Sequence, residues 1–157
     1  AQMLAGHQEV GGNFVGIVDI TSDEAHMYGI LQPGSVTNDL IKVEGMVEKP
    51  LPGQAPSNFA IVGRYILHAE VFDVLERQLA GVGAEIQLTE AMHSMLPTQD
   101  FYGWRFKGVR FDCGDKVGLL EANIACSLRR QDLNLRVRRM VERFAATYPR
   151  DGGDTCR

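Results

Sequence analysis

A loop enforced by prolines separates two extended segments, and this interruption constrains the fold more than any other feature. Residues 40–48 alternate apolar and polar side chains as a strand does, and residues 59–67 are apolar enough for a buried strand. The loop between them contains three prolines and a glycine, Pro50, Pro52, Pro56 and Gly53. Proline lacks an amide hydrogen and restricts the preceding residue to extended conformations, so Pro50 ends the first strand and keeps Lys49 extended.

The rest of the chain alternates extended and helical patterns. We expect a turn-rich loop over residues 32–39, and two short strands within residues 101–111 joined by a hairpin at Lys107-Gly108. Further strands are expected at 14–20 and 26–31, and helices at 1–10, 71–79, 88–96, 117–128 and 133–144. This mixture predicts an α/β fold with a mixed sheet. No glycine-rich phosphate loop follows the first expected strand.

Composition excludes several classes of protein. The chain has 157 residues with 45% apolar and 23% charged side chains, which is typical of a soluble globular domain. No apolar run approaches the roughly 20 residues of a membrane span, so we expect no membrane partner. The cysteines are widely spaced without a CxxC pair, at Cys113, Cys126 and Cys156. This spacing argues against a zinc site or a disulfide framework and favours the cytoplasm.

Charge is unevenly distributed along the chain. Residues 129–150 hold seven arginines against two acidic residues, whereas residues 1–128 hold eight basic and sixteen acidic residues. A basic stretch can indicate nucleic-acid binding, but this one carries only Phe144 and Tyr148 as aromatic residues and an apolar stripe runs through it. We therefore expect a solvated or inter-subunit helix face and no nucleic-acid partner.

Glu48 and Lys49 are the most suggestive pair for chemistry. Neighbours on a regular strand point to opposite faces, so both can reach one ligand only if the strand ends or twists there. A carboxylate in such a place can accept two sugar hydroxyls, and a lysine can neutralise a phosphate. Spacing alone favours a solvated pair at a strand end over such a ligand contact.

Other positions allow both a structural and a functional interpretation. Asp112 ends an expected strand and could bind a hard cation or orient a hydroxyl, or be a turn carboxylate, whereas Asp115 is expected to cap a helix. Gly29 within a strand indicates either a close backbone approach by a ligand or a bulge. Glu85 and Gln87 could line a polar pocket or simply lead into a helix.

Taken together, five motifs resemble bacterial UTP–glucose-1-phosphate uridylyltransferases. They fall in order: YGI at 28–30, VEKP at 47–50, APSNFAIVGRYIL at 55–67, AEIQLTEA at 84–91 and RFDCGDKVG at 110–118. VEKP is shared with other sugar-nucleotide transferases, whereas the APSN and DCGDK motifs are more specific. The resemblance spans roughly residues 10–128.

The resemblance implies a Rossmann-like mixed sheet of the sugar-nucleotidyltransferase type. It implies a Mg²⁺-dependent reaction of UTP with glucose 1-phosphate that gives UDP-glucose and pyrophosphate. By motif match, Glu48 would hold glucose hydroxyls and Lys49, as the catalytic residue, would meet the phosphates. The Gly29 backbone would approach the sugar, Asn58 and Val62 would shape the sugar end of the pocket, and Asp112 would lie near the sugar and the metal.

The resemblance also implies that a part of the fold is missing. The family's N-terminal nucleotide-binding half has no counterpart here, so we expect an incomplete sheet with an exposed edge and no catalysis by this chain alone. Residues 1–128 would form the sugar-binding, C-terminal part of the domain. Residues 129–150 would form a basic amphipathic helix that contributes to a homo-oligomer, and residues 151–157 a disordered tail. The alternatives are a non-catalytic sugar-phosphate-binding or assembly fragment, and a thymidylyltransferase-type relative.

Overall fold

A computed structural model of the chain describes residues 2–78 and 86–148. It divides into two compact units, Ala1–Lys107 and Gly108–Arg157, which are described separately below. This division falls earlier than the one after residue 128 expected from the sequence. The expected disordered tail, residues 151–157, lies outside the described residues. In the described ranges, no helix has the length and apolar character to cross a membrane.

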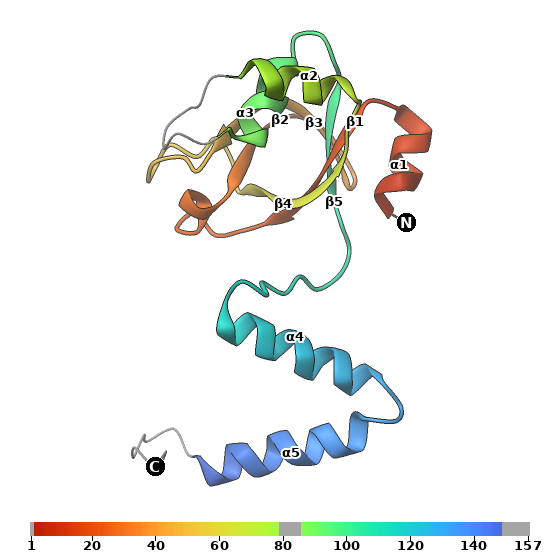
Figure 1. Ribbon diagram of the computed structural model, residues 1–157, viewed down its shortest axis with the longest axis vertical. Helices are drawn as coiled ribbons and strands as arrows, with labels where there is room; N and C mark the ends of the chain where they lie inside the picture. Colours follow the sequence, from red (N-terminus) through yellow and green to blue (C-terminus); the bar gives the residue numbers. More distant parts are fainter. Residues whose placement is uncertain (1, 79–85, 149–157) are drawn as a thin grey trace. The chain divides into compact units, whose positions relative to one another are not determined.

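The first unit combines helices with a five-stranded sheet (Figure 1). Its elements are α1 (Gln2–Val10), β1 (Asn13–Asp19), the short 3₁₀ helix η1 (Ala25–Met27), β2 (Gly29–Thr37), β3 (Leu40–Glu48), β4 (Phe59–Ile66), α2 (Glu70–Arg77), α3 (Leu88–Met95) and β5 (Phe101–Arg105). The expected helix 1–10 and the two strands flanking the proline loop are thus confirmed.

The sheet is mixed, as the sequence predicts, but its strands close into a ring. The order is β1-β4-β2-β3-β5, and β5 pairs in parallel with β1, while the other neighbours are antiparallel. Each described strand therefore has two neighbours, so the expected open edge is reduced to the seam between β2 and β4. The shortest strand pairing in the ring is between β2 and β4, which share one residue pair, Ile30 with Ala60.

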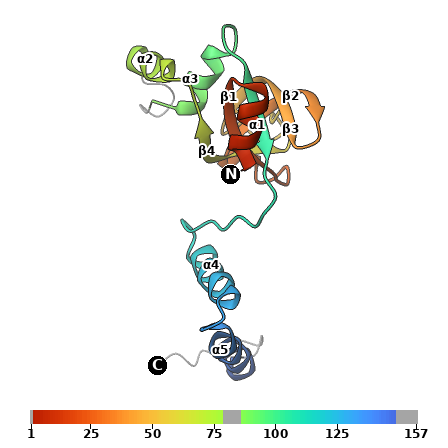
Figure 2. The same cartoon turned by 90° about the vertical axis from the view of Figure 1, so that its right-hand side faces the viewer.

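The core lies between the ring and its covering helices. Apolar side chains of β1, β2, β3 and β5 pack with Met92 and Met95 of α3, and α2 contributes Val71. Figures 1 and 2 show α2 and α3 together on one side of the ring, with α1 on another. The helix α1 approaches the sheet closely at Gly6, since a Cβ there would lie 2.5 Å from the Trp104 ring.

Two sequence expectations fail for reasons of strand pairing. The segment 32–39, expected as a loop, largely continues β2 to Thr37, and shifts in the β2–β3 register on both sides of Pro33 accommodate a residue without an amide hydrogen. The hairpin expected within 101–111 is also wrong, because residues 106–111 form no strand. Since β5 is already paired with β1 and β3, a second strand from this segment would have no place beside it.

The second unit consists mainly of two helices, α4 (Lys116–Arg129) and α5 (Asn134–Thr147). Asp115 caps α4 as expected, since its carboxylate accepts a hydrogen bond from the Gly118 amide at 2.8 Å. The two helices contact each other, yet neither contains a buried residue. Apolar side chains such as Val117, Leu120 and Leu135 are more than half exposed.

Candidate functional site

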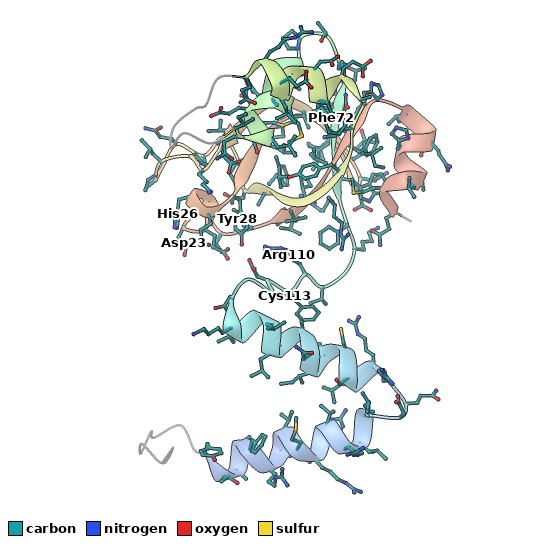
Figure 3. The ribbon with its side chains drawn as sticks, viewed as in Figure 1. Asp23, His26, Tyr28, Phe72, Arg110 and Cys113 are labelled. Atoms are coloured by element: carbon teal, nitrogen blue, oxygen red, sulfur yellow. The ribbon has the colours of Figure 1, made fainter. Side chains whose placement is uncertain are left out.

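Gly29 and Glu48 face each other across the first pair of the β2–β3 ladder. Gly29 begins β2 and Glu48 ends β3, so the YGI and VEKP motifs meet at one end of the sheet. The Lys49 amide extends this contact by donating a hydrogen bond to the Tyr28 carbonyl at 3.0 Å. Figure 3 shows Tyr28 in the segment that leads into β2, close to Asp23 and His26.

Two side-chain oxygens converge on the face of Gly29. A Cβ at this position would lie 2.9 Å from the Thr89 hydroxyl oxygen, 3.0 Å from Glu48 Oε2 and 3.3 Å from Ile61 Cδ1. Glycine is therefore required for close approach. An ionised carboxylate accepts hydrogen bonds, and a hydroxyl both donates and accepts them, so the pair suits a ligand that itself carries hydroxyl groups.

Lys49 departs from the extended conformation expected before a proline. Its φ is +44°, in the left-handed region that residues other than glycine seldom adopt. Lys49 is exposed, Glu48 is half-buried and Pro50 is buried. The strand therefore ends and turns at Lys49, and this meets the condition under which neighbouring residues can serve one ligand.

Val62 lies in a bulge of β4. The β1–β4 register jumps from Val15–Tyr65 to Ile17–Ile61, which leaves residues 62–64 outside the regular ladder, and Gly63 takes a φ of +68°. Bulges redirect side chains and are frequent beside functional sites. A glycine inside a strand pattern was the sequence signal for this bulge.

Asn58 is exposed just before β4, and its carbonyl accepts a hydrogen bond from the Ile20 amide at 3.0 Å. The neighbouring Ser57 hydroxyl donates to the Leu31 carbonyl and accepts from the Phe59 amide. The APSN motif therefore connects the end of the proline loop to the sheet through hydrogen bonds. The structure shows a backbone contact for Asn58, and its role toward a sugar stays a prediction.

Sequence reasoning did not select Thr89 and Tyr65 as site residues. Thr89 lies in the first turn of α3 and is only 6% exposed, so a buried hydroxyl in an otherwise apolar helix face was the available signal. Tyr65 lies on β4, where burial, and secondly the nearby Glu48 carboxylate, raise the pKa of its phenol. Thr89 lies near Glu48 because α3 packs on β3, and Tyr65 because β4 joins the same ring of strands.

Asp112 belongs to the second unit, apart from the unit that carries the other predicted site residues. Its carboxylate pairs with the Arg110 guanidinium at 2.9 Å and accepts a hydrogen bond from the Gly114 amide at 3.1 Å. Within the described ranges, no three His, Cys, Asp or Glu side chains gather as a metal site would require. Glu85 lies outside the described residues, and Gln87 is the residue before α3.

Comparisons with known proteins agree on one family. A sequence profile described as "Nucleotidyl transferase" matches residues 1–127. The UTP–glucose-1-phosphate uridylyltransferase of Staphylococcus epidermidis is 35% identical over 143 residues, which cover 91% of this chain and 50% of that protein. The chain thus spans about half the length of the curated relatives it matches.

Solved structures give the same picture. A UDP-glucose pyrophosphorylase complexed with UDP-glucose superposes with a TM-score of 0.77 at 33% identity, over 82% of this chain and 49% of that one. A putative glucose-1-phosphate thymidylyltransferase from Bacillus anthracis matches with a TM-score of 0.57 at 21% identity, covering 77% of this chain and 46% of that chain. That second likeness shows a shared fold alone.

Proposed function

Because the chain belongs to the nucleotidyl transferase family, we propose that it supplies the sugar-phosphate half of a UTP–glucose-1-phosphate uridylyltransferase site. In that reaction an oxygen of glucose 1-phosphate attacks the α-phosphorus of UTP, pyrophosphate leaves, and UDP-glucose forms. The observation that carries the proposal is the convergence of the Glu48 carboxylate and the Thr89 hydroxyl at Gly29, where a Cβ would lie within 3.0 Å of both oxygens.

Each residue has a role that follows from its chemistry. Glu48 accepts hydrogen bonds from glucose hydroxyls, and Thr89 offers a second oxygen beside it. Gly29 lets the sugar approach the backbone because it has no Cβ. Lys49, at the exposed end of β3, neutralises phosphate charge as a compact cation. Since no protein nucleophile is needed, the contribution of these residues is positioning and charge stabilisation.

Asp112 and Mg²⁺ form a separate part of the proposal. A carboxylate oxygen suits a hard cation, and the exposed Asp112 could offer one. However, the described residues bring no further ligands to it, and its carboxylate is engaged by Arg110 and the Gly114 amide. These residues do not by themselves fit a magnesium site, so no step of the mechanism is derived through the metal.

The setting and the assembly are also proposed. Two exposed free thiols, Cys113 and Cys126, support a reducing, cytoplasmic environment. The exposed apolar side chains of α5, which include Leu135 and Phe144, support a homo-oligomer contact through this helix. The relatives extend beyond the region that this chain matches. We expect the half that binds UTP to correspond to that other region.

The proposal is tested by calorimetric titration of the chain with glucose 1-phosphate. Gly29→Ala should weaken binding at least about tenfold, which corresponds to ~1.4 kcal/mol, because the new methyl group would displace the Thr89 hydroxyl and the Glu48 carboxylate that are proposed to hold the sugar. Gly45→Ala is the matched control on the same strand pair, where a Cβ would lie 2.8 Å from Gln32 Oε1 and far from the proposed ligand.

Two outcomes would contradict the proposal. Absence of glucose 1-phosphate binding by the unaltered chain would remove the sugar-phosphate role, and equal losses in both glycine variants would remove Gly29 from the site. The chain alone should also release no pyrophosphate from UTP and glucose 1-phosphate. Measurable release would show that it does not depend on a second half.

A further inference from the structure

Near the candidate site, none of the described strands borders the edge of β3 that faces away from β2. The pairing of β3 with β5 covers residues 40–42. Backbone groups of an antiparallel strand point alternately to its two sides. Because the Lys49 amide donates to the Tyr28 carbonyl on the β2 side, the Met46 amide, three residues earlier, points to the other side. The strand pairing therefore offers this amide no acceptor.

A side chain of α3 supplies the acceptor instead. The Met46 amide donates a hydrogen bond to His93 Nδ1 at 3.1 Å. Since a backbone amide donates and does not accept, Nδ1 carries no proton in this arrangement, and in the neutral ring the proton lies on Nε2. His93 is exposed and Met46 is buried, so the contact links a surface position of the helix to a covered position of the strand.

The same two elements meet again at the candidate site. Thr89 and His93 are one helical turn apart on α3. Met46 and Glu48 are two residues apart, so their side chains share a face of β3 and their amides share its edge. The Thr89 hydroxyl and the Glu48 carboxylate converge at Gly29, one step along from the Met46 contact. Four helical residues rise about 6 Å and two strand residues about 7 Å, so the two contacts are in step.

We propose that His93 is a positioning residue, which holds α3 on β3 in the register that places the Thr89 hydroxyl beside the Glu48 carboxylate. This inference rests on the proposed sugar-phosphate role, and it adds a residue that acts through Thr89 and not on the ligand. The hydrogen bond specifies the register because it needs one nitrogen opposite one amide. The apolar packing of Met92 and Met95 in the core is not directional in this way.

Three variants of α3 test the positioning role by calorimetric titration of the whole chain with glucose 1-phosphate. His93→Asn keeps an acceptor, because its amide oxygen is attached to the same side-chain carbon as Nδ1, and it should bind within about twofold of the unaltered chain. His93→Ala removes the acceptor and should bind about fivefold more weakly, as expected for one lost hydrogen bond. Ser94→Ala alters the next, exposed position of the helix and should bind as the unaltered chain does.

The order of the two His93 variants separates positioning from a general effect on the helix. Alanine has the highest helix propensity and asparagine a low one, so a residue that only stabilised α3 would be replaced better by alanine. The positioning role predicts the opposite order. A double variant tests the route of the effect. In a Thr89→Val background, where the hydroxyl is absent, His93→Ala should cause no further loss of affinity.

A second measurement uses the chain without ligand. At mildly alkaline pH, nitrogen-15 NMR of the His93 ring should show a proton on Nε2 and none on Nδ1. The Met46 amide should be protected from hydrogen exchange in the unaltered chain and in His93→Asn, and should lose protection in His93→Ala. A proton on Nδ1, or equal protection in all three proteins, would overturn the inference whatever the binding data show.

The binding results distinguish this inference from the proposal beneath it. His93→Ala could bind glucose 1-phosphate as the unaltered chain does, or better than His93→Asn, or add its loss to that of Thr89→Val. Each of these results would exclude action through Thr89 while leaving the sugar-phosphate role intact. Failure of the unaltered chain to bind glucose 1-phosphate would instead overturn that role and this inference together.

Discussion

At the scale of single residues, Lys49 stands in a conformation that suits glycine better than lysine. Lys49→Gly should therefore raise the free energy of unfolding by about 1 kcal/mol relative to Lys49→Ala, as measured by urea denaturation. On the regular part of the same strand, where Val47 pairs with Ile30, the order should reverse, so Val47→Gly should be less stable than Val47→Ala. A glycine at position 49 that is no better than alanine would argue against backbone strain.

Tyr65 offers a test of the charge at Glu48. Burial and the Glu48 carboxylate raise the phenol pKa above its usual value of 10.0. The raised pKa favours the neutral form in the folded state, so its contribution to stability is complete below about pH 10 and is lost as the pH rises through the folded pKa.

Glu48→Gln should lower this phenol pKa in an absorbance titration at alkaline pH, because the carboxylate charge is removed. Tyr65→Phe identifies the component of the titration that belongs to this residue. Glu44→Gln, which alters another acidic residue of β3, should leave that component in place. An unchanged titration in Glu48→Gln would mean that burial alone raises the pKa.

The site residues that could be predicted from the sequence are those on consecutive strands, and the residues from more distant elements could not be predicted. The pairing of Gly29 with Glu48 agrees with the adjacent YGI and VEKP motifs, because both lie on consecutive strands. Thr89 and Tyr65 could not be placed in advance, since one approaches Glu48 through the packing of α3 on β3 and the other through the pairing of β4 in the strand ring. The conformation of Lys49 was predicted wrongly, because tertiary contacts override the usual preference before proline.

At the scale of elements, the cap of α4 can be tested directly. Asp115→Ala should destabilise this helix by about 1 kcal/mol, because the Gly118 amide loses its acceptor. Far-ultraviolet circular dichroism during thermal melting measures the effect, and Asp115→Ser should largely restore the signal. Equal melting of all three proteins would show that the cap contributes nothing.

Helices were predicted well because each has its own apolar periodicity and its own end signals, as with Asp115 before α4. Strand β2 was predicted too short, since a local signal at Pro33-Gly34 looked like a turn, whereas pairing with β3 continues through a register shift. The hairpin after Arg105 failed for the opposite reason. Its local signal was sound, but β1 and β3 already occupy both sides of β5.

At the scale of the whole molecule, the two units differ in how they are stabilised. The first unit has a buried core, whereas α4 and α5 bury no residue. Unfolding should therefore take place in two steps. Helical circular dichroism should begin to fall at a lower urea concentration than the fluorescence of Trp104, the single tryptophan of the chain, which lies in β5.

Coincident transitions would contradict this expectation. They would mean that α4 and α5 gain their stability from contacts that form only when the first unit is folded. Repeating the denaturation at several protein concentrations separates this outcome from association of the helices between chains, because only association makes the midpoint depend on concentration.

The closure of the strand ring has a consequence for recombination between genes. Because each described strand has a neighbour on both sides within the segment, a different upstream sequence can be joined to it without removing a partner of any of these strands. The turn before β1 is therefore a suitable crossover point for chimaeras. Such chimaeras would retain the corner formed by Gly29, Glu48 and Lys49 behind a new upstream sequence.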